Sequence, residues 1–324
     1  MRILIILPNW LGDAIMATPA IELLAQHYPN ARFTFVGSFV SIEALKHHPL
    51  CERAIVDETK KASSRLFATY KLAKNLGAFH LAISFRNQLH ATLLLRLTNT
   101  VVCIAKRSWH SIFLLSHTPK ISTKQHLSLQ YAQLAMSDTE AWNHKAPHLA
   151  LYIKAKEFER PMLGINAGAT YGSAKRWYPE RFAEAAAFMS AKFDILIFGG
   201  PSEVEMAQEI ENSLVQLGVT NHTNIAGKTT IEELCANVAG CSLFITNDSG
   251  PMHVAAAYQV PTVAIFGPTK HTETSQWMNE KSKIVRHEMK CSPCMKRECP
   301  LGHHECMSTI GAHEVIEAIQ ELGF

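Results

Sequence analysis

Long hydrophobic runs are missing from this 324-residue sequence, and none approaches the roughly 20 residues that a membrane-spanning helix requires. The apolar start at residues 3–7 stops at Pro8-Asn9, which is too short for the core of a signal peptide. These absences predict a cytoplasmic protein. The chain is 47% hydrophobic and 18% charged, as is typical of folded globular proteins, and its length favours two domains.

Acidic residues are absent between Glu58 and Asp138, although the net charge of the whole chain is only +3. The basic residues of that stretch are Lys60, Lys61, Arg65, Lys71, Lys74, Arg86, Arg96, Lys106, Arg107, Lys120 and Lys124. Such a run of one charge sign predicts that something anionic approaches the first half of the chain. A solvated basic surface that only keeps the protein soluble is the alternative.

Two signatures of phosphate binding are also missing. No Asp-x-Asp pair is present to bridge a divalent cation to a diphosphate, and the glycine-bearing segment 166–177 lacks the Gly-Lys-Ser/Thr ending of a Walker loop. Cationic side chains and helix N-termini would therefore have to hold any phosphate. This favours chemistry that requires no metal cofactor.

Short β-branched runs alternate with helical apolar spacing along both halves, which is the pattern of parallel sheets with crossover helices. The polar, proline-bearing residues 138–161 interrupt it, so we expect an α/β protein with one Rossmann-like domain over residues 1–155 and another over 156–324. In the first domain we expect strands near 2–7, 31–37, 53–57, 80–85 and 100–105, and a first helix whose apolar face runs from Ile15 to Ala25. In the second we expect strands near 162–167, 194–199, 243–247, 262–266 and 283–286, and helices near 179–191, 203–217, 230–239 and 251–258. Doubly wound sheets bind ligands beyond the carboxyl ends of their strands, so the two domains are expected to face across a central cleft.

The first predicted strand leads through Asn9-Trp10-Leu11-Gly12-Asp13 directly into a helix. Asp13 falls where a helix N-cap is expected, and its carboxylate could simply accept hydrogen bonds from the first N–H groups of that helix. Beside a ligand, the same carboxylate could instead act as a general base and take the proton of an attacking hydroxyl. Position alone leaves both interpretations open.

Three strand ends of the second half are suited to a nucleotide. After the strand near 162–167 come small residues, hydroxyls and cations, among which Thr170 and Lys175 could hold a diphosphate. The segment Thr246-Asn247-Asp248-Ser249-Gly250-Pro251-Met252-His253 ends a strand and opens a helix whose free N–H groups would face an anion. Glu203, in a third turn, could accept hydrogen bonds from ribose hydroxyls or simply cap its own helix.

Four of the eight cysteines lie close together, as Cys291-x-x-Cys294 followed by Cys299 and Cys306. This spacing can supply a tetrahedral structural zinc site, with the neighbouring His303 and His304 as further candidate ligands. Cys299 and Cys306 are further apart than a second Cys-x-x-Cys pair would be. Reduced thiols without a metal, or an occasional disulfide, are therefore the alternatives.

Taken in order, residues 9–14, 168–177, 199–203 and 247–253 resemble the motifs of the ADP-heptose:lipopolysaccharide heptosyltransferase family, glycosyltransferase family 9, and particularly its heptosyltransferase II branch. The resemblance covers nearly the full chain. It implies a GT-B architecture, an ADP-heptose donor and inversion at the anomeric carbon. It also implies an acceptor whose first core heptose is already attached to Kdo-lipid A.

The resemblance implies roles for individual residues as well. Asp13 matches the family's proposed base, and Thr170 and Lys175 match residues that contact the donor phosphates, so Asp13 and Lys175 would carry the catalysis. The remaining donor-binding residues would be Glu203, Asp248, Ser249, Gly250 and His253. From their positions near predicted strand ends, Asn9, Arg86, Lys106 and Arg107 are expected to bind the anionic acceptor.

The expected partners are the ADP-heptose donor, the lipid A-Kdo-heptose acceptor and, by peripheral contact, the cytoplasmic face of the inner membrane; the protein would be a monomer that binds no nucleic acid. A heptosyltransferase I-type enzyme, another GT-B transferase and a sugar-nucleotide epimerase are the alternatives. A zinc-containing nucleic-acid-binding protein is more remote, because it would need aromatic side chains for stacking among the basic ones. Most aromatics in the basic stretch are expected in the core; they are Phe67, Tyr70, Phe79, Phe85, Trp109 and Phe113.

Overall fold

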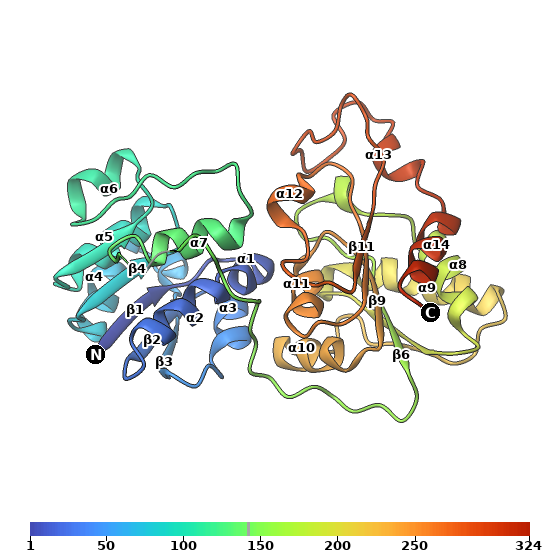
Figure 1. Cartoon of the computed structure of the whole chain (residues 1–324), viewed down its shortest axis with the longest axis horizontal. Helices are drawn as coiled ribbons and strands as arrows, with labels where there is room; N and C mark the ends of the chain where they lie inside the picture. Colours follow the sequence, from blue (N-terminus) through green and yellow to red (C-terminus); the bar gives the residue numbers. More distant parts are fainter. Residues whose placement is uncertain (141–142) are drawn as a thin grey trace. The chain divides into compact units, whose positions relative to one another are not determined.

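The computed structural model describes residues 1–140 and 143–324. Residue contacts divide the chain into two compact units, Met1–Tyr152 and Ile153–Phe324, called the N-terminal unit and the C-terminal unit below. The sequence placed the domain boundary after residue 155, inside the polar segment 138–161, of which positions 141–142 lie outside the described residues. Figure 1 shows the course of the chain through each unit.

The N-terminal unit contains a parallel sheet in the order β3-β2-β1-β4-β5. Its strands are β1 (Arg2–Ile6), β2 (Arg32–Gly37), β3 (Cys51–Val56), β4 (Leu81–Ser84) and β5 (Val102–Ala105). Its helices are α1 (Leu11–Met16), α2 (Thr18–His27), α3 (Phe39–Leu45), the 3-10 helix η1 (Thr59–Lys61), α4 (Arg65–Leu76), α5 (Leu89–Leu97), α6 (Trp109–Leu114) and α7 (Leu127–Ala135). The central strands β1 and β4 are covered on both faces, which is why they read as continuous apolar runs.

The strand order of this sheet reverses at β1, which pairs with β2 on one side and with β4 on the other. Ligands of doubly wound sheets bind at such a switch point, between the loops that follow the two strands. Here the two loops are joined directly, because Nε of Arg86, after β4, donates a hydrogen bond to the carbonyl oxygen of Leu7, after β1, at 2.5 Å.

The C-terminal unit contains a second parallel sheet, in the order β11-β10-β9-β6-β7-β8. Its strands are β6 (Met162–Asn166), β7 (Asp194–Phe198), β8 (His222–Asn224), β9 (Leu243–Asn247), β10 (Thr262–Ile265) and β11 (Ser282–Val285). Its helices are η2 (Ser173–Lys175), α8 (Pro179–Met189), η3 (Pro201–Glu203), α9 (Val204–Gln216), α10 (Ile231–Gly240), α11 (Gly250–Ala257), α12 (His271–Thr274), α13 (Glu305–Ser308) and α14 (Ala312–Glu321). Two parallel sheets of this kind confirm the predicted α/β class.

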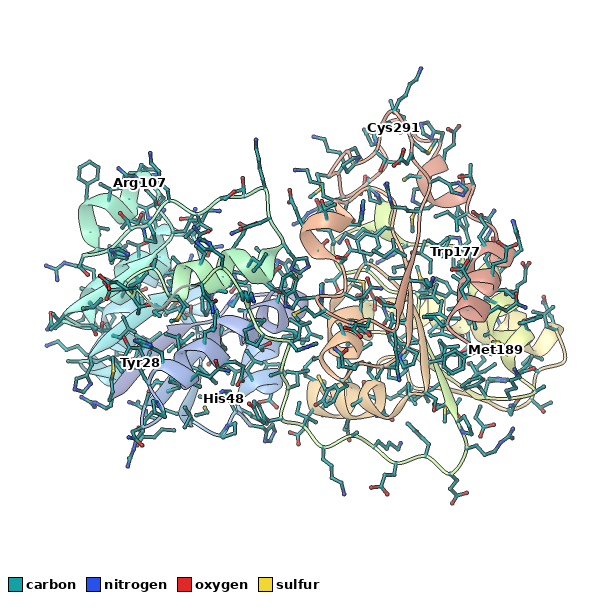
Figure 2. The ribbon with its side chains drawn as sticks, in the orientation of Figure 1. Tyr28, His48, Arg107, Trp177, Met189 and Cys291 are labelled. Atoms are coloured by element: carbon teal, nitrogen blue, oxygen red, sulfur yellow. The ribbon has the colours of Figure 1, made fainter. Side chains whose placement is uncertain are left out.

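The main core of the C-terminal unit includes apolar side chains of its strands and of α8, α9 and α14. Helix α8 packs against both α9 and α14. Ile165 and Ile197 project into it from neighbouring strands, and Figure 2 labels two other members, Trp177 and Met189. Trp177 is only 1% exposed, and its indole N–H donates to the carbonyl of Ile310 at 3.0 Å. This side chain therefore anchors the end of the loop that follows β6.

Two expectations about local structure were wrong. The single first helix is broken at Ala17 into α1 and α2, because Pro19 lies in the first turn of α2 and cannot continue a helix from before it. The edge strand β8 was missed, since its three residues show no apolar alternation and form a strand only by pairing with β7.

Candidate functional site

Lys175 and Asp248 meet at the switch point of the C-terminal sheet, where β6 pairs with β7 on one side and β9 on the other. Nζ of Lys175, in the loop after β6, lies 2.5 Å from Oδ2 of Asp248, in the loop after β9. The side chains are 13% and 4% exposed. The sequence selected both residues as donor ligands, and the structure shows that they also form an ion pair with each other.

Two asparagines tie the same pair of loops together. Oδ1 of Asn247 accepts the backbone N–H of Trp177 at 3.1 Å, and its Nδ2 donates to the carbonyl of Ala167 at 2.5 Å. Nδ2 of Asn166 donates to the carbonyl of Gly168 and to Oγ of Ser249, at 3.2 and 3.1 Å. Asn247 stood in a selected motif and Asn166 in a predicted strand, and neither was given a role. They fix the loop backbones, so Lys175 approaches α11 in a defined position.

The start of α11 has the character of an anion site. Ser249 occupies its N-cap position, but its hydroxyl bonds to Asn166 and Thr246 and makes no capping bond to the helix. The first N–H groups of an eight-residue helix are thus left without that side-chain acceptor, at the positive end of its dipole. The predicted ligand His253 follows within the first turns and is buried.

Glu203 and Gly168 are in close contact. Oε2 of Glu203 accepts the N–H of Gly200 at 2.8 Å, so the carboxylate does cap its own turn, as the simpler interpretation proposed. A Cβ at position 168 would overlap the Glu203 carboxylate, which shows how closely the loop after β6 passes it.

The sequence did not select Thr269, whose hydroxyl donates to Oδ2 of Asp248 at 2.6 Å. Thr170, by contrast, is exposed.

In the N-terminal unit, Asp13 is not the helix cap. Trp10 occupies the N-cap position of α1, and Asp13 is the third residue of the helix, because the helix begins directly after Trp10. The carboxylate is partly exposed, and its negative charge acts on Tyr131. Burial first, and the negative charge of Asp13 second, raise the pKa of Tyr131 well above its ordinary value.

Arg86 belongs to a buried network around Asp57, a residue that the sequence did not single out. Oδ2 of Asp57 lies 3.1 Å from Nη1 of Arg86 and 3.1 Å from Nε2 of His90, and Oδ1 accepts the Thr59 hydroxyl at 2.6 Å. Burial alone would raise the pKa of Asp57, but the hydrogen bonds of His90 and Thr59 and the charge of His90 hold it well below its usual range.

The network uses most of the guanidinium of Arg86, which is 7% exposed. Within the described residues its Nη2 is buried without a hydrogen-bond partner.

Ser84 is in register with Ala105, so Lys106 and Arg107 leave the sheet at the same edge as Arg86. Figure 2 labels Arg107, which is exposed. Asn9 accepts the Ser38 hydroxyl at its backbone carbonyl, at 2.7 Å.

The aromatics of the basic stretch are more exposed than expected. Phe79 and Phe85 are buried, but Phe67, Tyr70, Trp109 and Phe113 are exposed, the last two by 73% and 84%. They were expected at core positions, but Phe67 and Tyr70 on α4 and Trp109 and Phe113 on α6 are left uncovered. In the part of the chain that the structure describes, no helix has the length and apolarity needed to cross a bilayer.

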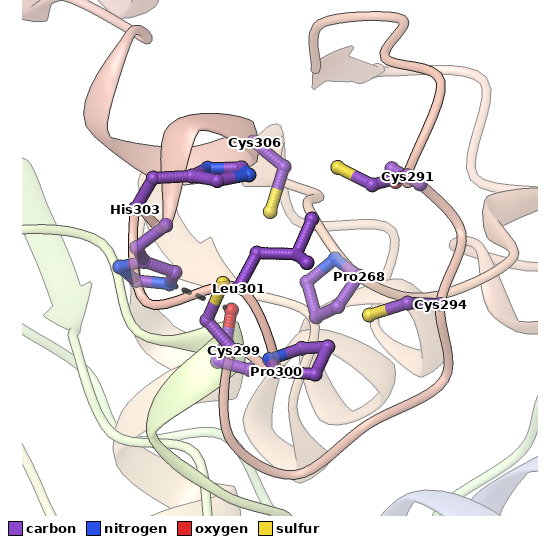
Figure 3. A pocket seen from close by; sticks show the side chains of 11 residues that line it. Pro268, Cys291, Cys294, Cys299, Pro300, Leu301, His303 and Cys306 are labelled. Carbon is purple, nitrogen blue, oxygen red and sulfur yellow. Dashed lines mark hydrogen bonds between the residues drawn. The ribbon is translucent and has the colours of Figure 1, made fainter.

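Cys291, Cys294, Cys299 and Cys306 line one pocket in the C-terminal unit (Figure 3). All four are free thiols. Burial, and then the nearby Cys294, Cys291 and Cys299, raise the pKa of the Cys306 thiol to about 11. As they stand, no three His, Cys, Asp or Glu side chains of residues 1–140 and 143–324 are grouped closely enough to hold a metal ion.

The chain matches the family model of glycosyltransferase family 9 (heptosyltransferase) over residues 69–305. It is 40% identical to lipooligosaccharide heptosyltransferase 2 of Campylobacter jejuni, covering 99% of this chain and 98% of that protein. It is 28% identical to lipopolysaccharide heptosyltransferase 2 of Escherichia coli K12, with coverages of 99% and 98%. The solved ADP-heptose LPS heptosyltransferase II of E. coli is similar with a TM-score of 0.81, at 24% identity and coverages of 99% and 98%.

These likenesses first define the class: two Rossmann-like units in one chain form the GT-B fold of glycosyltransferases. The chain belongs to glycosyltransferase family 9, the heptosyltransferases. The family and the fold class predicted from the sequence are therefore confirmed.

Proposed function

We propose that this protein transfers L-glycero-D-manno-heptose from ADP-heptose to the first heptose of the lipopolysaccharide inner core, with inversion at the anomeric carbon. The observation that carries the proposal is the meeting of Lys175, Asp248 and the start of α11 at the switch point of the C-terminal sheet. It occurs in a chain that is 40% identical, over 99% of its length, to a lipooligosaccharide heptosyltransferase 2.

In this proposal the C-terminal unit, from about residue 156 onward, binds the donor. Lys175 and the first N–H groups of α11, after Ser249 and Gly250, stabilise the negative charge that grows on ADP as it leaves. Asp248 holds the Lys175 ammonium in place, and the exposed Thr170 hydroxyl donates to a phosphate oxygen. With these groups in position, the diphosphate needs no divalent cation.

The nucleoside end of ADP would lie toward Glu203 and His253. One carboxylate oxygen of Glu203 accepts the N–H of Gly200, so the other can accept a ribose hydroxyl. The contact with Gly168 keeps that carboxylate next to residues 168–175, which are called the phosphate loop below. The short span from Gly168 to Lys175 thus links ribose recognition to phosphate recognition.

Asp13 of the N-terminal unit is the proposed base. Its carboxylate takes the proton of the acceptor hydroxyl while the hydroxyl oxygen attacks the anomeric carbon and the bond to ADP breaks. One such displacement inverts the centre. Asn9, Arg86, Lys106 and Arg107, which leave the sheet at the ends of β1, β4 and β5, are proposed to bind the carboxylates and phosphates of the acceptor.

Substitution of Asp13 tests both the substrates and the base. Purified protein is given ADP-heptose and a lipid A-Kdo-heptose acceptor, and ADP release is measured. We expect Asp13→Asn to lower kcat by at least about a hundredfold, as is typical when a general base is lost, while ADP binding measured by calorimetry stays within twofold. Asp138→Asn, an exposed carboxylate of the same unit, is the matched control. Full activity of Asp13→Asn would refute the base, and an inactive wild type would refute this substrate pair.

We further propose that the exposed apolar residues of α6 contact the cytoplasmic face of the inner membrane. Trp109, Ile112 and Phe113 are exposed directly after Lys106 and Arg107, in a stretch without acids. Aromatic side chains next to cations suit the headgroup region of an anionic bilayer. The double variant Trp109→Ala/Phe113→Ala should bind phosphatidylglycerol vesicles at least about tenfold more weakly by sedimentation. Phe188→Ala, an exposed aromatic of the C-terminal unit, should not; equal binding by all three proteins would exclude this surface.

A further inference from the structure

Four thiols converge on the pocket that Figure 3 shows. Cys291 and Cys294, which are separated by two residues in the sequence, lie on one side of the pocket. Cys299 and Cys306 lie on the other side. Cys306 is the second residue of α13 and is buried, while the other three are partly exposed. The proposed transfer reaction uses none of these residues.

The chemistry of this set fits a soft metal ion. Four cysteine sulfurs, two of them from a Cys-x-x-Cys pair, are the ligand set of structural zinc sites and of iron-sulfur proteins. Both ring nitrogens of His304 contact the loop after β6, at Tyr178 and Ala174, and Nδ1 of His303 accepts the N–H of Glu305 at 3.0 Å.

We propose that Cys291, Cys294, Cys299 and Cys306 bind one tetrahedrally coordinated transition-metal ion, Zn²⁺ or Fe²⁺, as thiolates. The four cysteines line one pocket but are not grouped closely enough to hold an ion as they stand, so binding requires their side chains to rotate toward a common centre. Each thiol loses its proton as its sulfur bonds to the ion, so binding releases up to four protons and the cation balances the charge of the thiolates that form.

The ion would also position the phosphate loop, a consequence that rests on the proposed function. The N–H of Ala174 donates to the carbonyl of Arg297 at 3.0 Å, and its carbonyl contacts Nε2 of His304 at 2.9 Å. The cysteine segment therefore holds both backbone groups of the residue that precedes Lys175. A third bond runs from the Tyr171 hydroxyl to the carbonyl of Met295, at 2.8 Å.

The same segment is anchored at the end of β10. Oγ of Ser292 donates to the carbonyl of Gly267 at 2.6 Å, and the N–H of Met295 donates to the carbonyl of Pro268 at 2.9 Å. A metal ion inside the segment would thus connect the end of β10 to the phosphate loop. We expect its removal to loosen Lys175 and to leave the chemical step itself intact.

The first experiment measures metal in the full-length protein purified without added metal or affinity-tag histidines. We expect zinc and iron together to approach one ion per chain by mass spectrometry, and their ratio identifies the ion. Protein stripped with a chelator under reducing conditions should bind Co²⁺ with the intense thiolate-to-cobalt absorption of a tetrathiolate site. Absence of both bound metal and this absorption would overturn the site.

Serine variants assign the ligands. Cys294→Ser, at a partly exposed position, should lose the cobalt absorption or bind Co²⁺ at least about tenfold more weakly, while its circular dichroism stays unchanged. Cys51→Ser is the matched control, because Cys51 is partly exposed in the N-terminal unit, on β3. Equal loss in both variants, or in neither, would refute the assignment to this cluster.

A binding measurement tests the link to the phosphate loop. Metal-free protein should bind ADP about tenfold more weakly than metal-loaded protein, and zinc should restore the affinity. Unchanged ADP affinity would overturn the positioning role while the metal content still stands. If metal is bound but heptose transfer is absent from the wild type, the proposed function fails and the metal site does not, so the two failures are distinguishable.

Discussion

The ion pair of Lys175 and Asp248 allows a quantitative test of how the donor loops are held together. At 2.5 Å and an effective dielectric constant of about 20, two unit charges attract by about 7 kcal/mol, most of which offsets their lost hydration. Removing one partner of a buried pair typically destabilises a protein by about 3–5 kcal/mol. Because Lys175 keeps 13% exposure, we expect Lys175→Met to fall at the lower limit, about 3 kcal/mol.

The partner variant should behave differently. Asp248→Asn leaves an ammonium that can turn toward solvent, so we expect a loss of only about 1–2 kcal/mol. The double variant Lys175→Met/Asp248→Asn leaves no buried charge and should regain most of the loss, lying within about 1 kcal/mol of the wild type. The coupling energy of the cycle is then about 3 kcal/mol, well above experimental error.

The measurement must isolate the C-terminal unit, because the two units need not unfold together. Hydrogen exchange is measured as a function of urea for peptides of residues 153–324. It gives the free energy of unfolding of the C-terminal unit directly. A Lys175→Met protein within about 1 kcal/mol of the wild type, or a double variant no more stable than Lys175→Met, would refute the reasoning. ADP binding should be weakened in both, since both lack the ammonium.

Three other substitutions test the structure more briefly. The lowered pKa of Asp57 means that its stabilising contribution is present above the unfolded-state pKa of about 3.9 and is lost as pH falls from there toward the folded-state pKa. Asp57→Asn should therefore destabilise the N-terminal unit at pH 7 and make its unfolding free energy less steep in pH on the acid side; an unchanged slope in denaturant titrations would contradict this. Gly168→Ala should displace the Glu203 carboxylate and weaken ADP binding, and calorimetry that finds wild-type affinity would show that the loop adapts. Trp177→Ala should destabilise the C-terminal unit by about 3–5 kcal/mol by exchange in urea, through the cavity and the lost bond to Ile310, whereas a loss below about 1 kcal/mol would mean that the loop collapses into the space.

The strands at the centre of each sheet were predictable because burial on both faces makes them continuous apolar runs. β6 and β9 begin within a residue of their expected positions. Lys175 and Asp248 could also be selected, since each follows such a strand. Their contact could not, because it depends on β6 and β9 being neighbours in the sheet, which no local pattern of residues encodes.

The roles that were missed depend on the same long-range register. Asn247 holds Trp177 from 70 residues away, and Asp57 neutralises Arg86 across 29 residues. In the sequence, each is an ordinary polar residue at a strand end. Trp109 and Phe113 were expected in the core because they are large and apolar, but the sequence does not show whether another element covers them.

Four free thiols around one pocket also have a consequence for how a cell that contains this protein responds to toxic metals. Soft monovalent copper prefers thiolate sulfur to nearly every other protein ligand. An excess of copper would therefore compete for the segment that holds the backbone of Ala174. Copper bound by these cysteines would then disturb the loop that carries Lys175, without contacting the sugar nucleotide itself.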